Sequence, residues 1–164
     1  MNSRSGMNMS LGVGAITSGS TKQNINTPSS THTELVATSD AMPKMLWCRY
    51  FMESQDYTVE DVYVYQDNQS SILLEQNGSL SIGKASRHVK IKYCVITDKV
   101  KNKELRIIYC PTKQMIADFF TKPLQGELYF THRNAILGIQ ECDMPLYIKA
   151  YKEYRESIRC IVKT

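Results

Sequence analysis

The chain has 164 residues, of which 42% are hydrophobic and 22% are charged, and its formal net charge is +4 at pH 7. These values are typical of one small globular domain and exclude a long disordered or low-complexity protein. The sequence has no apolar run of about 18 residues that would predict a membrane span, and its polar start does not resemble a signal peptide. Five scattered cysteines without a Cys-x-x-Cys pair indicate reduced thiols in an intracellular compartment, cytoplasm or nucleus, and argue against a zinc site.

Strands and helices are predicted to alternate along the chain, which indicates an α/β fold. In chain order the expected elements are a hairpin at 6–11 and 14–20, a helix at 31–54, a strand at 61–66, a helix at 68–76, a basic helix at 87–101, a strand at 105–109, and helices at 113–121 and 127–137. Pro43 removes one backbone donor and is expected to kink the first helix. Trp47 and Phe51, four residues apart in that helix, are expected in the core rather than as platforms for stacked bases.

Asp67 stands where the strand at 61–66 ends and the next helix begins. Open α/β sheets bind ligands beyond the carboxyl ends of their strands, so a carboxylate at this place is suited to a metal. An Asp at this place is also an ordinary helix N-cap, and the residue types alone leave both interpretations open. Two more acids have definite settings: Glu34 near the start of the long helix, and Asp118 in a short helix that should end before Pro123.

An ordered series of short motifs carries a resemblance to a known family. The motifs are Ser18-Gly19-Ser20-Thr21-Lys22-Gln23, Ser29-Ser30-Thr31-His32-Thr33-Glu34-Leu35-Val36, Asp67-Asn68-Gln69-Ser70, Arg87-His88-Val89-Lys90-Ile91, Tyr109-Cys110-Pro111-Thr112, and the long run from Met115 to Gly126. In this succession residues 6 to about 139 resemble the ribonuclease H domain at the end of a copia-type retrotransposon polyprotein. The resemblance implies a mixed sheet with flanking helices and the strand order 3-2-1-4-5, in which the first three strands are antiparallel. It therefore predicts a domain at 1–139 and leaves 140–164 as a tail, whose apolar spacing fits a short helix.

The same resemblance implies a metal-dependent endonuclease that cuts the RNA strand of RNA/DNA hybrids, downstream of a reverse transcriptase domain in one polyprotein. Four carboxylates would hold two Mg²⁺ or Mn²⁺ ions, and three of them correspond to Glu34, Asp67 and Asp118. By resemblance Asp67 would be a shared ligand, Glu34 would bind the second metal and position the substrate, and Asp118 would bind the metal on the leaving-group side. The fourth carboxylate belongs to the first, central strand, and residues 1–33 contain neither Asp nor Glu.

The missing carboxylate predicts an impaired enzyme, encoded by a reading frame that begins inside an element that is degraded or whose start is wrongly assigned. The sheet is expected to lack its central strand, so that the hairpin moves, pairs directly with the strand at 61–66, or receives a strand from another polypeptide. A non-catalytic relic that binds nucleic acid is the alternative. An unrelated carboxylate–metal protein would require the ordered motifs to be coincidental.

Basic residues concentrate between residues 84 and 106. Those expected to contact the phosphates of a hybrid duplex are Lys84, Arg87, His88, Lys90 and Lys92. For His88 itself, packing against the sheet is favoured over contact with nucleic acid. The alternative without nucleic-acid binding is that the basic residues form a solvated helix face and the apolar residues of the segment lie in the core: Val89, Ile91, Val95 and Ile96.

Overall fold

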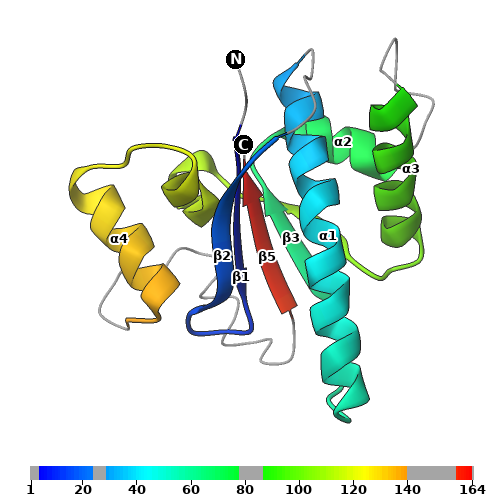
Figure 1. Ribbon diagram of the computed structural model, residues 1–164, viewed down its shortest axis with the longest axis horizontal. Helices are drawn as coiled ribbons and strands as arrows, with labels where there is room; N and C mark the ends of the chain where they lie inside the picture. Colours follow the sequence, from blue (N-terminus) through cyan, green and yellow to red (C-terminus); the bar gives the residue numbers. More distant parts are fainter. Residues whose placement is uncertain (1–3, 24–28, 78–86, 140–157, 164) are drawn as a thin grey trace.

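The computed structural model describes residues 4–23, 29–77, 87–139 and 158–163. They form one mixed sheet in which strands and helices alternate along most of the chain (Figure 1), so the predicted α/β class is confirmed. The elements are β1 (Arg4–Ser10), β2 (Ala15–Lys22), α1 (Ser30–Ser54), β3 (Val62–Gln66), α2 (Gln69–Asn77), α3 (Arg87–Lys101), β4 (Arg106–Tyr109), the 3-10 segments η2 (Thr112–Gln114) and η3 (Ile116–Phe120), α4 (Gly126–Leu137) and β5 (Ile158–Lys163).

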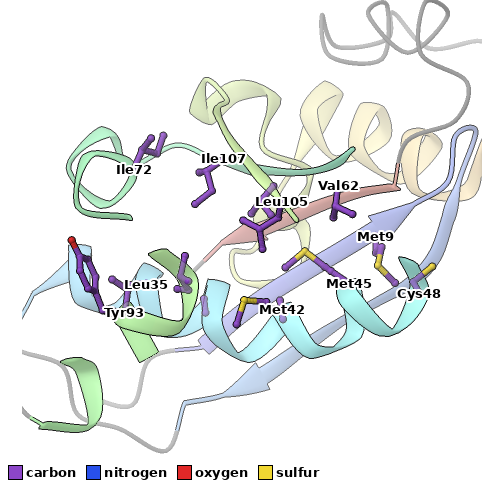
Figure 2. Packing of buried hydrophobic residues seen from close by; sticks show 14 of the residues in the cluster. Met9, Leu35, Met42, Met45, Cys48, Val62, Ile72, Tyr93, Leu105 and Ile107 are labelled. Carbon is purple, nitrogen blue, oxygen red and sulfur yellow. The ribbon is translucent and has the colours of Figure 1, made fainter. Parts of the chain in front are cut away.

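The alternation of side chains along β3 separates the core into two parts. Val62 and Val64 are buried in the larger cluster, together with residues of α1, α3, β1 and β4. Tyr65 belongs to a second cluster with residues of the segment after β4. Because successive strand residues point to opposite faces, these two clusters lie on opposite faces of the sheet. Figure 2 shows Leu35, Met42 and Met45 of α1 in the larger cluster, with Met9 of β1 and Val62 nearby.

The centre of the sheet contains a strand that the sequence pattern did not predict. The strand order is β2-β1-β5-β3-β4, and β5 is antiparallel to β1 and parallel to β3. Cys160 is the register partner of both Met9 and Val64. The expectation that the sheet lacks its central strand is therefore wrong: the C-terminal end of the described chain supplies one, and β5 takes the place that the implied order 3-2-1-4-5 gives to strand 1.

Residues 158–163 are also a strand rather than part of the expected helical tail. Their sequence, Ile-Arg-Cys-Ile-Val-Lys, is rich in β-branched residues. Pairing on both sides satisfies backbone N–H and C=O groups of β1 and β3 that would otherwise face an empty gap. Residues 140–157, the rest of that tail, lie outside the described residues.

Helix α1 begins at its predicted place and runs through Pro43. Ser29 caps it, because its hydroxyl accepts a hydrogen bond from the backbone N–H of His32. Trp47 and Phe51 were expected in the core, and this expectation is wrong. The two residues are 65% and 48% exposed, and their rings stack on each other with centroids 5.3 Å apart. The spacing of four residues correctly put the two rings on one helix face, but Met42, Met45 and Cys48 occupy the face that packs on the sheet.

Two 3-10 segments replace the predicted helix at 113–121. Met115, with φ −76° and ψ 90°, separates η2 from η3 because its backbone is not helical. Segment η3 lies directly against β1 at Gly6, where a Cβ atom would be only 2.4 Å from the carbonyl oxygen of Ala117. Glycine is needed for this close approach, and the approach fixes the position of the residue that follows, Asp118.

Candidate carboxylate site

Asp67 directly follows β3 and is half-buried. The hydroxyl of Thr112 donates a hydrogen bond to Asp67 Oδ2, with the two oxygens 3.0 Å apart. The N-cap interpretation of Asp67 is not supported, because the side chain of Asn68 caps α2: its Oδ1 accepts from the backbone N–H of Ser71 at 3.1 Å.

Asp118 lies in η3 and is 4% exposed. Lys122, four residues later, forms an ion pair with Asp118, with Lys122 Nζ 2.8 Å from Asp118 Oδ2. The lysine side chain is 44% exposed. Asp118 Oδ1 has no hydrogen-bond partner within the described part of the chain. The carboxylate is therefore shielded from water on most sides and is already held by one cationic group.

The charges of Asp67 and Asp118 both act on Cys110, the residue that follows β4. Cys110 is buried, and burial together with the negative charges of Asp67 and Asp118 raises the pKa of its thiol to about 12. The thiol stays protonated at neutral pH and is neither a nucleophile nor a metal ligand there. Two of the three carboxylates that the sequence analysis selected, one at the end of β3 and one in η3, therefore act electrostatically on the same buried residue.

Glu34, the third, sits among different neighbours. It lies in the second turn of α1 and is 5% exposed. Its charge acts on Glu75 of α2, a carboxyl group with 0% exposure. Burial is the main cause that raises the pKa of Glu75 to about 8; the Glu34 charge adds to this increase, and hydrogen bonds from Gln66, Thr38 and Ser71 oppose it. We call these five side chains the Glu34–Glu75 cluster: Glu34, Thr38, Gln66, Ser71 and Glu75.

Sequence reasoning missed Glu75, although a signal was present. Ile72 and Glu75 are three residues apart in α2 and therefore share a helix face, and Ile72 is a core residue. His132 was missed as well: it is 1% exposed, its Nε2 lies 3.3 Å from the carbonyl oxygen of Lys113, and the Asp118 charge acts on it. Burial is the main cause that lowers the pKa of His132, so the imidazole is neutral at pH 7.

Within residues 4–23, 29–77, 87–139 and 158–163, no three His, Cys, Asp or Glu side chains are placed to hold one metal ion. Strand β5 runs beside β3 toward Asp67, with Ile161 opposite Tyr65, but its sequence contains no acidic residue. The central strand therefore restores the sheet without restoring the fourth carboxylate.

The exposed face of α3 carries part of the expected nucleic-acid contact surface. Arg87, His88 and Lys90 are exposed. The favoured packing of His88 against the sheet is therefore wrong. Lys92 forms an ion pair with Asp40 of α1. Lys84 lies outside the described residues.

Helix α3 buries a narrower apolar face than expected. Val89 and Ile96 are buried, as the alternative interpretation of this segment requires, together with Tyr93 and Thr97. Ile91 and Val95 are 53% and 41% exposed, although that interpretation placed both in the core. The buried residues recur every three to four positions, which leaves the alternate apolar residues on the outer face of the helix.

Comparison with known proteins supports a retrotransposon origin. The chain is 28% identical over 109 residues to a retrovirus-related Pol polyprotein from transposon TNT 1-94 of Nicotiana tabacum, a stretch that is 66% of this chain and 8% of that polyprotein. No protein-family model and no solved structure gave a significant match. Among the described helices, none is both long and apolar enough to cross a membrane.

Proposed function

We propose that this chain is a ribonuclease H-like domain of a copia-type retrotransposon that binds nucleic acid and whose nuclease activity is impaired or lost. The observation that carries the proposal is the central strand: β5 completes the sheet between β1 and β3 but brings no carboxylate to the end where Asp67 stands. The similarity to a Pol polyprotein and the match between the observed and implied strand orders support the ancestry.

The loss of activity follows from what the remaining acids do. Two divalent ions would activate a water molecule and stabilise the leaving oxygen of the RNA strand, and both need carboxylates at one place. In this chain Asp118 is held by Lys122, Asp67 accepts from Thr112, and Glu34 faces Glu75. The contacts of Asp118 with Lys122 and of Asp67 with Thr112 stabilise the folded domain, whereas the Glu34 charge disfavours ionisation of Glu75. We expect none of these arrangements to hold two ions.

Binding to nucleic acid is supported by the outer face of α3. Arg87 and Lys90 are exposed, and neither has an ion-pair partner within the described residues. Cations of this kind contact phosphates and release condensed counterions, which makes the affinity strongly dependent on salt. A hybrid duplex is recognised largely through its shape, its backbone and its 2′-hydroxyl groups.

An active endonuclease is the second candidate, because Asp67 after β3 and Asp118 in η3 both act electrostatically on Cys110. The decisive experiment is cleavage of a labelled RNA/DNA hybrid by the purified chain with Mg²⁺ or Mn²⁺. We expect little or no cleavage from this chain, and cleavage from a version in which an acidic first strand, added upstream, replaces β5 between β1 and β3. Cleavage by the chain itself that Asp67→Asn abolishes would contradict the proposal.

Binding is tested separately by fluorescence anisotropy on the same hybrid at several salt concentrations. The double variant Arg87→Gln, Lys90→Gln is expected to bind more weakly and to reduce the slope of log K against log salt by up to about 2, one for each lost phosphate contact. Lys44→Gln, an exposed lysine on α1, is the matched control and should leave the slope unchanged. An unchanged slope in the double variant would remove α3 from the interface.

A further inference from the structure

A groove lies between the β1–β2 hairpin and helix α1, on the face of the sheet that α1 covers. It consists of two hollows, of about 370 Å³ and about 230 Å³, and Lys44 lines both of them. The larger hollow alone is within the range of about 300–1,000 Å³ that is typical of small-ligand pockets. Its floor is made of alternate strand residues, paired across β1 and β2 as Met9 with Thr17, Met7 with Gly19 and Ser5 with Thr21. We call this feature the hairpin groove.

The larger hollow is almost entirely apolar. Ile16 of the hairpin and Trp47 and Phe51 of α1 line it, and they are 50%, 65% and 48% exposed. Figure 2 shows Met9 and Cys48, which line its inner side, at this end of the core. The lining offers one hydroxyl group, from Thr17, and one ammonium group, from Lys44. A ligand in this hollow therefore gains affinity from buried hydrocarbon rather than from hydrogen bonds.

The smaller hollow is positively charged. Lys22 and Lys44 both line it, and neither takes part in an ion pair within the described residues. Among its lining residues the one acid is Asp40, which is already paired with Lys92 of α3. Ser5 Oγ accepts from Gln23 Nε2 at 2.8 Å, so its own proton is available for an anion.

Space for a head group is present between the two lysines. A Cβ atom at Gly19, on the floor of the smaller hollow, would meet nothing within 4 Å. An anion there would face two ammonium groups and no unpaired carboxylate among the lining residues. Such charge-assisted contacts are stronger than those between neutral groups.

The order of the hollows defines the chemistry of the ligand. An apolar hollow that joins a cationic one at Lys44 matches a molecule with a hydrocarbon tail and an anionic head. A nucleobase or a peptide backbone carries several donors and acceptors, which the apolar lining would leave without partners. A hydrocarbon chain carries none, so its transfer from water has no such cost.

We propose that the hairpin groove binds one monomeric amphipathic anion, an aliphatic chain with a single carboxylate head. The tail lies against Ile16, Trp47 and Phe51, and the carboxylate lies between Lys22 and Lys44. The outer face of α3 takes no part, so the proposal does not depend on nuclease activity or on nucleic-acid binding.

Trp47 is the only tryptophan of the chain and reports directly on the apolar hollow. The full chain is titrated with sodium decanoate below its micelle concentration, and Trp47 emission and the heat of binding are measured. We expect a saturable shift of the emission to shorter wavelength and one decanoate bound per chain. Acetate, which has the head without the tail, should give no shift. Decanol, which has the tail without the charge, should bind about 5- to 25-fold more weakly, because each exposed ion pair contributes up to about five-fold in affinity.

Matched variants separate the head site from the tail site. Lys22→Gln with Lys44→Gln should weaken decanoate binding by about 5- to 25-fold and leave decanol binding unchanged. Phe51→Ala should weaken the binding of both ligands by about three-fold or more, because it removes apolar contact area. Phe130→Ala removes an aromatic ring that is 53% exposed on α4, outside the groove, and should change neither affinity.

Three results would overturn the proposal. The absence of a saturable shift with decanoate would leave the groove without this ligand. Equal affinities for decanoate and decanol, or unchanged decanoate binding in the double lysine variant, would remove the carboxylate from the lysines. A shift that phosphatidylglycerol vesicles produce and monomeric decanoate does not would assign the groove to a membrane surface instead.

Discussion

Replacement of Glu75 by glutamine should make the protein more stable at alkaline pH and leave its stability almost unchanged at acidic pH. Glutamine has the shape of the protonated acid and does not ionise. Glu75 is 0% exposed, and its pKa is raised to about 8 from an ordinary value of 4.5, mainly by burial. The native state therefore keeps this carboxyl group neutral over a range in which the unfolded chain has already ionised it.

The direction and size of the effect follow from proton linkage. Below pH 4.5 both states hold the proton, and the stability contributed by the neutral group is fully present. Between the unfolded and folded pKa values the unfolded chain binds fewer protons, so the free energy of unfolding falls as pH rises, by about 1.4 kcal/mol per pH unit. Over the interval from 4.5 to about 8 the loss has a ceiling of about 5 kcal/mol, and it levels off above pH 8. Relaxation of α2 or entry of water would reduce this figure.

The measurement is urea unfolding of both proteins in EDTA across this pH range. The difference in free energy of unfolding between Glu75→Gln and the unmodified chain should grow with pH and reach about 2 to 4 kcal/mol near pH 8. Because both proteins share every other titrating group, including His132, the difference isolates Glu75. Glu60→Gln, at an exposed glutamate, should give a small difference that is the same at every pH. A difference for Glu75→Gln that does not change with pH would refute the assignment of a buried neutral carboxyl group.

Three further substitutions test how the sheet and the carboxylates are held. Gly6→Ala places a Cβ 2.4 Å from the carbonyl oxygen of Ala117 and should lower the free energy of unfolding by about 1–3 kcal/mol. The control Gly19→Ala, on β2, meets nothing within 4 Å and should have little effect. Equal urea midpoints for the two variants would contradict the close approach of η3 to β1. Cys160→Pro removes a backbone donor from the central strand and should destabilise the fold by about 3 kcal/mol or more, while Cys160→Val should be tolerated. If thermal unfolding followed by circular dichroism gave the two variants the same Tm, β5 would be excluded from the centre of the sheet. Lys122→Gln should lower stability by about 1 kcal/mol or less in thermal unfolding at moderate salt, because the lysine is 44% exposed, and a much larger loss would mean that its pair with Asp118 is closed to water.

The candidate site could be predicted in part. Asp67 and Asp118 were selected from their positions after a strand and before Pro123, and both charges raise the pKa of the same buried thiol, Cys110. Glu34 was selected with them, and its charge raises the pKa of Glu75, which the sequence analysis did not select. The spacing of Glu75 from Ile72 was a signal for a buried position, but it could be used only once Ile72 was known to be a core residue, which the tertiary structure decides.

Local patterns determined most of the elements. The alternation of side-chain types predicted β3, and the basic segment predicted α3 over its observed bounds. Gly138 ends α4 as expected, in the left-handed conformation with φ 72°. These outcomes depend on interactions between residues that are only a few positions apart in the chain, so the local sequence is enough to predict them. Local spacing also gave the pairing of Trp47 with Phe51 on one face of α1.

Only the tertiary structure decided which faces were buried and what filled the centre of the sheet. The spacing of Trp47 and Phe51 could not tell that the opposite face of α1 packs on the strands. Nothing local to residues 158–163 indicated that they would lie between β1 and β3, because that place exists only after two distant strands have each left a hydrogen-bonding edge. The same long-range packing lets the charge of Glu34 act on Glu75, and the charges of Asp67 and Asp118 act on Cys110. Separations along the chain carry no information about which groups will be buried near one another.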